Sequence, residues 1–328
     1  MARKVLVTEK ISETGYNHLL QNNCEIVDGS GKAEDIIARE AAGCDAILTR
    51  NGEITRSLLQ ANPQLQVVAM HGVGVDNIDV PAATELGVYI TNTPGANSNS
   101  VAEFALSLIL ALAKHLVLYH NHMQAGNWGI SRVLGGDIKG KTLGIVGVGN
   151  IGRLTAQKAA ALGMQVLAYK RGYTGEGPAL GENITLTANL DEVMAKADFV
   201  SLHVPFTPGT ENLISAEKIA LMKPTAYLVN TARGEVIDNA ALYKAVESKK
   251  IAGAALDVFV GGYPDPADPL LHSENILVTP HVAAFTHSAV DTMSLYAAMG
   301  VIEALDGKKP SFAVNQPQNC KAGKGIGA

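Results

Sequence analysis

The stretch GKTLGIVGVGNIGR, residues 140–153, decides the fold of the larger part of this chain. It places Gly147, Gly149 and Gly152 in the spacing G-x-G-x-x-G, directly after an apolar run and before a helical pattern that begins near Leu154. In that context the first glycine permits a tight turn, the second lets a phosphate approach the backbone, and the third lets the helix pack closely on the strand. The stretch therefore predicts a strand, a turn and a helix whose N-terminus holds a dinucleotide.

Outward from this loop, short β-rich runs alternate with helical patterns, which is typical of βαβ units around parallel sheets. From residue 143 onward, the runs LGIVGV, QVLAY, DFVSLHV, AYLVN, GAALDV and ILVTP predict a full dinucleotide-binding sheet of six strands. Before it, strands at residues 4–7, 46–49, 66–70 and 88–91, with a helix at 12–21, predict a small flavodoxin-like unit. The predicted fold class is α/β, with two Rossmann-like domains, a flavodoxin-like one and a doubly wound one.

Two further apolar-periodic segments predict long helices. Residues 98–125 are interpreted as one helix that carries the chain from one domain into the next. Residues 288–305 predict a second helix, which is followed by a tail rich in Lys, Gly, Pro and Asn.

Composition excludes several classes of protein. The chain has 328 residues, enough for two domains, and its net charge of −5 without a long Lys/Arg run argues against a nucleic acid or a membrane surface as partner. Cys24, Cys44 and Cys320 are too few and too far apart for a disulfide framework or a zinc cluster, so no metal is expected. The apolar stretch 104–113 is about half of a bilayer span, and the first residues lack a secretory signal. We therefore expect a cytoplasmic protein that binds small molecules.

The end of the second strand of the dinucleotide sheet bears on the choice of cofactor. An NAD-binding unit places a carboxylate about 20 residues after the glycine loop, where it binds the ribose hydroxyls. Here the strand QVLAY is followed by Lys170 and Arg171, two cations that attract a 2′-phosphate. The sequence therefore favours NADP over NAD, and the alternative is that both residues are only solvated surface charges.

Seven blocks of sequence follow one another in a characteristic order: HGVGVDNID, NTPGANSNSVAE, GKTLGIVGVGNIGR, LHVPFTPGTENLI, LVNTARGEVID, LDVF and VTPHVAAFT. Together they resemble the D-isomer-specific 2-hydroxyacid dehydrogenase family, which includes phosphoglycerate dehydrogenases and glyoxylate and hydroxypyruvate reductases. The resemblance implies a discontinuous substrate domain, residues 1–100 plus 287–328, around a dinucleotide-binding domain of residues 101–286. It also implies an active site in the cleft between the domains and a homodimer formed through the dinucleotide-binding domains.

Reduction of a 2-keto acid needs a cation for the carboxylate, a proton donor for the keto oxygen and a hydride donor beside C2. Arg233 and His281 each follow a predicted strand, so both stand at the carboxyl edge of a parallel sheet, where ligands bind. The resemblance assigns Arg233 to the substrate carboxylate and carbonyl, His281 to acid/base catalysis and Asp257 to the nicotinamide end. The plainer alternatives are a surface ion pair, a packed histidine and a carboxylate in a strand-end turn.

The resemblance also assigns binding residues in both domains. In the loop of residues 71–74, the backbone N–H groups of Val73 and Gly74 would face the substrate carboxylate, and the start of the helix at residue 98 would present further donors. Core packing and helix capping are the alternative interpretation. The substrate-binding set is His71, which occupies a specificity position, Val73, Gly74, Asn97 and Ser100. The cofactor-binding set is Gly147, Gly149, Asn150, Ile151, Gly152, Lys170, Arg171, His203, Val204, Pro205, Thr207, Thr231, Ala232, Arg233, Asp257 and His281.

One position departs from the family pattern. The family places a glutamate five residues after the aspartate of LDVF, where it hydrogen-bonds the catalytic histidine, but this chain has Gly262 there and Tyr263 next. Asp265 is the nearest carboxylate that could replace it. If nothing replaces the glutamate, we expect reduction to fade at a less alkaline pH.

Three functions fit these residues. The first is NADP(H)-preferring reduction of a small 2-keto acid to the D-2-hydroxy acid, or the reverse reaction. The second is an NAD-linked dehydrogenase of the phosphoglycerate type. The third is a dinucleotide-sensing regulator of the same fold, which the lost glutamate favours but which would need neither Arg233 nor His281.

Overall fold

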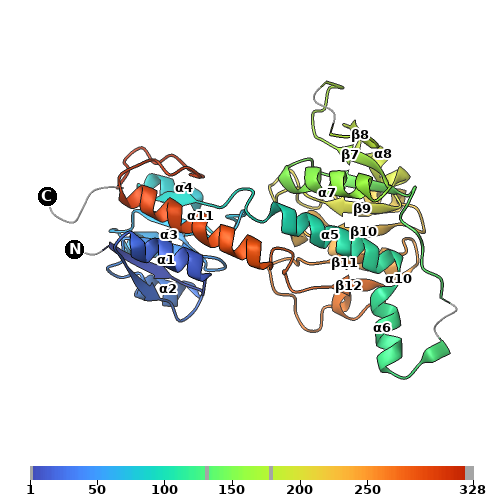
Figure 1. The fold of residues 1–328 in the computed structure, drawn as a ribbon, viewed down its shortest axis with the longest axis horizontal. Helices are drawn as coiled ribbons and strands as arrows, with labels where there is room; N and C mark the ends of the chain where they lie inside the picture. The colour runs from blue at the N-terminus through green and yellow to red at the C-terminus, as the bar shows by residue number, and fades with distance from the viewer. Residues whose placement is uncertain (1–2, 130–132, 177–179, 322–328) are drawn as a thin grey trace. The chain divides into compact units, whose positions relative to one another are not determined.

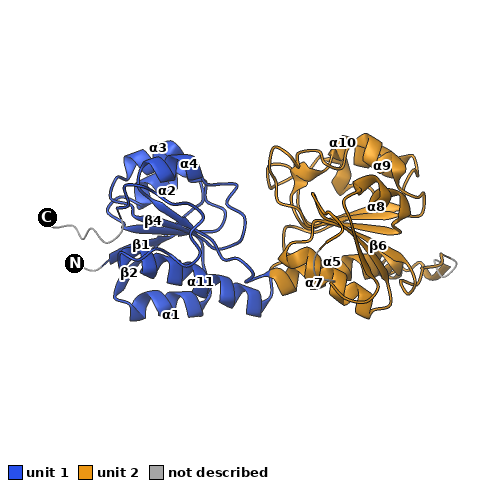
Figure 2. Cartoon of the chain, turned by 90° about the horizontal axis from the view of Figure 1, so that it is seen from above, with its two compact units in different colours: residues 1–97, 285–328 blue, residues 98–284 orange. Residues whose placement is uncertain are grey.

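A computed structural model describes residues 3–129, 133–176 and 180–321. The chain divides into two compact units (Figure 2). Unit 1 comprises residues 1–97 and 285–328, and unit 2 comprises residues 98–284.

Unit 1 is built on a parallel sheet of five strands in the order β2-β1-β3-β4-β5. This is the flavodoxin-like order, so the prediction for this part is confirmed. Helices α1 and α11 cover one face of the sheet, and α2, α3 and α4 cover the other (Figure 2). The strands are β1 (Arg3–Val7), β2 (Cys24–Asp28), β3 (Ala46–Thr49), β4 (Val67–Met70) and β5 (Tyr89–Thr91), and the helices are α1 (Glu13–Gln21), α2 (Glu34–Glu40), α3 (Arg56–Ala61), α4 (Val80–Glu85) and α11 (His287–Leu305).

The core of unit 1 explains why its central strands are continuous apolar runs. Val5 and Val7 of β1 pack in the cluster below α1 and α11, whereas Leu6 packs in the cluster on the opposite face. A strand covered on both faces must be apolar at every position. Helices α1 and α11 approach closely at Gly15, where a Cβ atom would lie 2.9 Å from the Cβ of Ser294.

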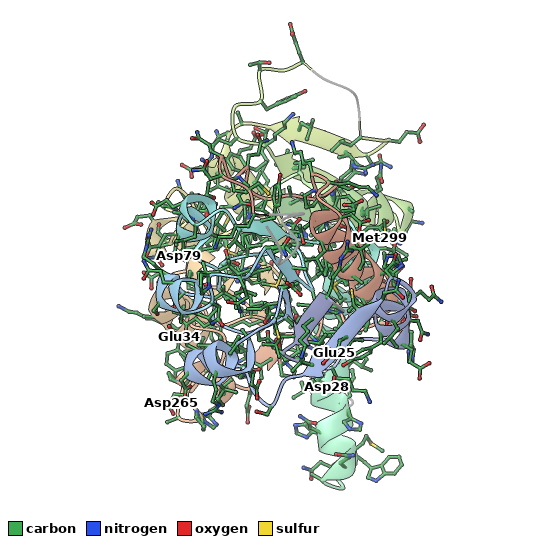
Figure 3. All side chains as sticks on the ribbon, turned by 90° about the vertical axis from the view of Figure 1, so that its left-hand side faces the viewer. Glu25, Asp28, Glu34, Asp79, Asp265 and Met299 are labelled. Atoms are coloured by element: carbon green, nitrogen blue, oxygen red, sulfur yellow. The ribbon has the colours of Figure 1, made fainter. Side chains whose placement is uncertain are left out.

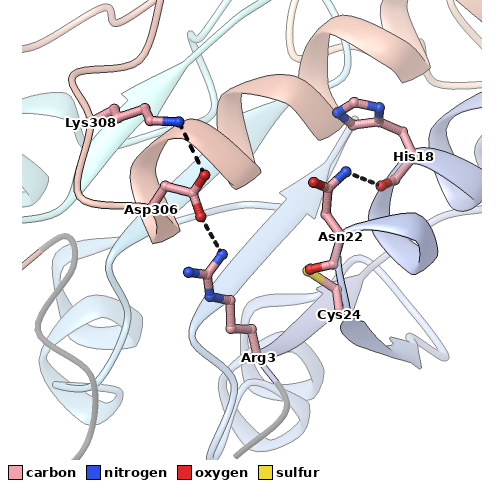
Figure 4. Close-up of polar contacts among 6 residues, drawn as sticks. All are labelled: Arg3, His18, Asn22, Cys24, Asp306 and Lys308. Atoms are coloured by element: carbon pink, nitrogen blue, oxygen red, sulfur yellow. Dashed lines mark hydrogen bonds and ion pairs between the residues drawn. The ribbon is translucent and has the colours of Figure 1, made fainter.

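Strand β2 was not expected from the sequence. It is an edge strand that pairs only with β1 among the described strands, and of its five residues only Cys24 is buried. Figure 3 labels Glu25 and Asp28 on this strand, and such charges are common on sheet edges. On β1, Arg3 pairs with Asp306, just after the end of α11, at 2.6 Å (Figure 4).

Unit 2 is built on a parallel sheet of seven strands in the order β12-β11-β10-β9-β6-β7-β8. This is a doubly wound Rossmann sheet with one added strand, which confirms the predicted fold class. Helices α5 and α7 cover one face, and α8, α9 and α10 cover the other (Figure 2). The strands are β6 (Thr142–Val146), β7 (Gln165–Tyr169), β8 (Ile184–Thr187), β9 (Phe199–Leu202), β10 (Tyr227–Asn230), β11 (Gly253–Leu256) and β12 (Ile276–Val278), and the helices are α5 (Ser98–Ala113), α6 (Leu116–Gln124), α7 (Asn150–Ala161), α8 (Leu190–Lys196), α9 (Ala216–Leu221) and α10 (Asn239–Glu247).

The prediction of one helix over residues 98–125 was wrong. The chain forms α5 and α6, bent by 62°, because His115 between them adopts the left-handed conformation with φ +51. A residue with positive φ cannot continue a right-handed helix. No single helix among the described residues is long and apolar enough to cross a membrane, and only the bent pair reaches that length together.

Candidate active site

The glycine loop joins β6 to α7, and each of its three glycines is required for a different reason. Gly147 has φ +100, and a Cβ atom there would lie 2.7 Å from the carbonyl oxygen of His203. A Cβ on Gly152 would lie 2.0 Å from the carbonyl oxygen of Gly147. No described atom outside its chain neighbours lies within 4 Å of a Cβ on Gly149, so this glycine leaves open the side from which a phosphate can approach.

The N-terminus of α7 follows directly after Gly149. Gly149 is the N-cap of the helix, and its first turn, which begins with Asn150 and Ile151, contains no acidic residue. The first N–H groups of a helix have no partner within it, and the helix dipole favours a negative charge there. The loop and the helix therefore fit the pyrophosphate of a dinucleotide.

Two cations follow β7, at the strand end where a bound dinucleotide presents its adenosine ribose. Lys170 and Arg171 are both exposed, and Arg171 Nη2 donates to the carbonyl oxygen of Gly209 at 3.1 Å. Gly209 belongs to a turn in which Thr210 Oγ1 accepts from the N–H of Thr207 at 2.8 Å. The structure therefore brings Arg171 to the loop after β9, which contains Thr207 of the expected cofactor-binding set.

His203 and Val204 pack against the glycine loop. Its Cβ lies 3.3 Å from the position of a Cβ on Gly152, and Val204 Cγ1 lies 2.7 Å from that of a Cβ on Gly147. The His203 Nε2 atom and the Ser201 hydroxyl are 3.0 Å apart. Burial lowers the pKa of His203 to about 3, so its ring stays neutral at neutral pH.

The loop that carries Arg233 is held by a buried amide at the end of β10. Asn230 Oδ1 accepts from the N–H of Ala232 at 2.9 Å, and its Nδ2 donates to the carbonyl oxygen of Arg233 at 2.8 Å. Arg233 Nη1 donates to the carbonyl oxygen of Ala232 at 2.7 Å. Thr231 Oγ1 is buried without a hydrogen-bond partner among the described residues, which leaves it available to a ligand.

Asp257, directly after β11, holds the loop that carries His281. It is fully buried, and its Oδ1 accepts from the Thr279 hydroxyl at 2.6 Å and from the N–H of Val282 at 2.9 Å. Its Oδ2 accepts from the N–H of Ala283 at 2.9 Å. The carboxylate that the resemblance assigned to the nicotinamide end is thus bonded to the backbone and side chain of the histidine loop.

Arg233, Asp257 and His281 follow three strands that are neighbours in one sheet, β10, β11 and β12. Because the strands are parallel, the three loops lie along one edge. The first two loops also touch each other, since a Cβ on Gly234 would lie 2.2 Å from the carbonyl carbon of Phe259. The structure therefore brings the predicted catalytic residues to the same edge as the glycine loop.

The position of the missing glutamate lies in a bend of two glycines. Gly261 and Gly262 have φ +69 and +88, and the Gly261 N–H donates to Glu235 Oε1 at 3.1 Å. Asp265, the expected substitute, is exposed and accepts from the N–H of Ala267 at 2.8 Å within its own turn. The Asp265 carboxylate therefore stabilises its own turn through this hydrogen bond.

The expected substrate residues of unit 1 lie at the carboxyl end of β4. His71 is buried, and its Nε2 lies 2.9 Å from Ser294 Oγ of α11. Ser294 Oγ also donates to Val290 O at 2.7 Å, and the His71 Nδ1 atom is buried without a hydrogen-bond partner among the described residues. Val73 is 38% exposed, so its part of the loop is open to a ligand.

The expected residues at the start of α5 are Asn97, which is partly exposed, and Ser100. Asn97 Oδ1 is buried and has no hydrogen-bond partner among the described residues, and Ser100 is buried in the first turn. Gly74 and Pro205 lie in the loops after β4 and β9, as expected.

Sequence reasoning missed two residues that hold the site, Asn230 and Thr279. Both are polar residues at the carboxyl ends of apolar strands, next to a predicted catalytic residue. A polar residue at such a strand end is the sequence feature that could have identified them. Which atoms they hold depends on loop geometry that the sequence does not show.

The glycine loop, the helix N-terminus and the strand-end residues of unit 2 define a dinucleotide-binding protein of the Rossmann class. The model of the family described as D-isomer specific 2-hydroxyacid dehydrogenase, NAD binding domain, matches residues 106–283. The chain belongs to the D-isomer specific 2-hydroxyacid dehydrogenase family, which confirms the resemblance drawn from its motifs.

Individual relatives extend this similarity over nearly the whole chain. Glyoxylate reductase of Korarchaeum cryptofilum is 38% identical and covers 96% of this chain and 97% of its own length. D-3-phosphoglycerate dehydrogenase of Methanocaldococcus jannaschii is 37% identical over 96% of this chain, which spans only 60% of that relative. The solved structure of NADPH-dependent glyoxylate/hydroxypyruvate reductase from Sinorhizobium meliloti, in complex with NADP and malonate, has a TM-score of 0.84 at 27% identity and covers 96% of this chain and 97% of its own.

Proposed function

We propose that this protein reduces a small 2-keto acid to the D-2-hydroxy acid with a nicotinamide dinucleotide, or catalyses the reverse reaction. The observation that carries the proposal is the placement of Arg233 and His281 at the ends of β10 and β12, on one edge with the glycine loop. Relatives named glyoxylate reductase and D-3-phosphoglycerate dehydrogenase support this class of reaction.

Each residue has a role that its chemistry suits. The cofactor, when bound, supplies or accepts the hydride. Arg233 presents a planar, permanently charged guanidinium to the substrate carboxylate and carbonyl. His281 donates the proton to the keto oxygen and takes it back in the reverse reaction, because an imidazole exchanges protons near neutral pH.

We infer that NADP(H) is preferred over NAD(H). Lys170 and Arg171 stand where an NAD-specific site has a carboxylate, and the hydrogen bond from Arg171 to Gly209 holds its guanidinium beside the loop after β9. The Sinorhizobium meliloti relative, which was solved in complex with NADP, supports this choice. A higher kcat/KM with NADH than with NADPH would overturn it.

We also propose a homodimer formed through α6, and a cytoplasmic location. No residue of α6 is buried, and the segment that begins with it exposes Leu116, Met123, Trp128 and Leu134 by 61%, 44%, 77% and 84%. A second copy would remove this apolar surface from water. All three cysteines are thiols outside any disulfide, which suits a reducing compartment.

The test of function is a panel of 2-keto acids with NADPH and NADH. Glyoxylate, hydroxypyruvate, pyruvate and branched or aromatic acids would be compared in wild type, His281→Asn and Arg233→Lys. We expect His281→Asn to lower kcat by about 100-fold or more, because proton transfer contributes about that much. Arg233→Lys should lower kcat/KM, because the fork is lost.

His272→Asn is the matched control, since His272 lies on the exposed side of unit 2. It should leave both constants unchanged. Tight cofactor binding without reduction of any acid would favour the dinucleotide-sensing regulator, for which the glycine at position 262 is the supporting observation. With a phosphorylated 2-keto acid added to the panel, activity confined to NADH and this acid would favour the phosphoglycerate-type enzyme.

A further inference from the structure

One buried carboxylate binds the whole loop that carries His281. The three donors to Asp257 are the Thr279 hydroxyl and the N–H groups of Val282 and Ala283, at 2.6, 2.9 and 2.9 Å. They all belong to residues 279–283, with His281 in the middle. A fully buried carboxylate is stable only when its oxygens accept hydrogen bonds, so the loop and the carboxylate fix each other.

The backbone of His281 needs such support. Its φ is +55, in the left-handed region that residues with a Cβ rarely adopt. A conformation of this kind persists where the surrounding contacts over-determine it. Here the Thr279 hydroxyl, before His281, and the Val282 N–H, after it, donate to the same carboxylate. These two hydrogen bonds hold the bend around the histidine.

Thr279 joins this bend to the sheet. Its N–H donates to Leu256 O at 2.9 Å, and its carbonyl oxygen accepts from the His281 N–H at 3.1 Å. Pro280, between the two, has a φ fixed by its ring. The Thr279 hydroxyl is therefore the side-chain link between the Asp257 carboxylate and the first residue of the bend.

The departure from the family pattern makes this link more important. Where the family has a glutamate that hydrogen-bonds the histidine, this chain has Gly262, which has no side chain. A side chain at position 262 therefore does not orient the imidazole in this chain.

We propose that Thr279 and Asp257 are positioning residues that set the direction of the His281 imidazole for proton transfer. The proposal rests on the proposed function. This role differs from a direct contact between Asp257 and the nicotinamide end of the cofactor. Loss of such a contact would weaken cofactor binding, whereas misplacement of His281 would lower kcat.

The experiment compares Thr279→Val, which removes the hydroxyl and keeps the shape, with Thr279→Ser, which keeps the hydroxyl. For Thr279→Val we expect kcat for keto acid reduction to fall by about 10- to 100-fold, since a misplacement of about 1 Å can cost that much. The Kd for NADPH, measured by fluorescence titration, should stay within about twofold of wild type. Thr279→Ser should recover most of kcat, and the pH profile of kcat should change in Thr279→Val alone.

Thr155→Val is the control, because Thr155 is also buried in unit 2 but donates only to Ile151 O within its own helix, at 3.0 Å. It should keep wild-type kcat. Wild-type kcat in Thr279→Val, equal losses in the Val and Ser variants, or a rise in Kd that matches the loss in kcat would each overturn the proposal. If Thr279→Val does not fold, Thr279→Ala replaces it, with the same expected split between kcat and Kd.

A second measurement is independent of turnover. The Cε1–H resonance of His281 can be assigned in NMR spectra by its loss in His281→Asn. Thr279→Val should shift that resonance and its titration, and leave those of the other histidines in place. If the wild type reduces no keto acid but this shift occurs, the proposed function fails and the positioning role stands; an unchanged resonance overturns the positioning role.

Discussion

At the scale of single residues, two histidines with lowered pKa values, His71 and His203, contribute to the way stability depends on pH. Burial, and after it the charge of Arg50, lowers the pKa of His71 to about 4, and burial lowers the pKa of His203 to about 3. In the unfolded chain a histidine takes up its proton near pH 6.5. Because the folded protein binds that proton only at much lower pH, acid favours the unfolded state.

We therefore expect stability to be fully present above about pH 6.5 and to fall as the pH drops towards about 4. A pKa displaced from 6.5 to about 4 corresponds to about 3 kcal/mol at the lower end of this window. His71→Gln, which keeps an N–H donor for Ser294, should make the urea midpoint fall less steeply with acid than in wild type. His272→Gln, at an exposed position, should keep the wild-type slope, and parallel slopes for His71→Gln and wild type would contradict the prediction.

At the scale of elements, the turn from β6 to α7 contains one glycine that the fold requires and another that ligand binding requires. The glycine spacing in the sequence does not distinguish the two. Gly152 is required by the protein itself, because a Cβ there would meet the carbonyl oxygen of Gly147 at 2.0 Å. Gly149 has an extended backbone with φ −78, and described atoms outside its chain neighbours leave its Cβ position open. The space beside Gly149 is therefore required only by the ligand.

This difference predicts opposite outcomes for two alanine substitutions. Gly149→Ala should keep the wild-type Tm and weaken NADPH binding by about tenfold or more, which is about 1.4 kcal/mol. Gly152→Ala should lower the stability by about 1–3 kcal/mol, because the added methyl group displaces the turn. Thermal unfolding and fluorescence titration of both variants measure this; a lowered Tm for Gly149→Ala with unchanged affinity would sink the argument.

At the scale of the whole molecule, the exposed apolar side chains of Leu116, Met123, Trp128 and Leu134 predict assembly. In Figure 1, α6 extends away from the sheet of unit 2. The start of α6 is bonded to the chain segment after it, since Lys114 pairs with Asp137 at 2.6 Å and Tyr119 donates to Val133 O. A supported surface of this kind suits an interface better than a free end does.

We expect Trp128→Glu to weaken the dimer by about 30-fold or more in sedimentation velocity, because a buried tryptophan typically contributes at least about 2 kcal/mol to an interface. Trp128 is the only tryptophan of the chain, so its emission in wild type should shift to shorter wavelength as the dimer forms. Leu162→Glu, at another exposed leucine of unit 2, is the control and should leave association unchanged. A wild type that sediments as a monomer at micromolar concentration would refute the interface.

The sequence by itself determined the two parallel sheets, the glycine loop and the strand ends that carry Arg233 and His281. Central strands of a parallel sheet are buried on both faces and therefore form apolar runs that can be recognised without coordinates. The edge strands β2 and β8 were missed, because their outer residues face water and carry no such pattern. A glycine spacing is equally local, which is why it could be read directly.

Only the tertiary structure decided the break at His115, the direction of His71 towards Ser294 and the partners of Asp257. No glycine or proline marks the break, and each hydrogen bond joins residues that are distant in the chain or that meet only when a loop folds back. Hydrophobic periodicity reports burial, whereas a hydrogen bond depends on the position and direction of two particular atoms. Those positions exist only once the strands have paired and the loops between them are closed.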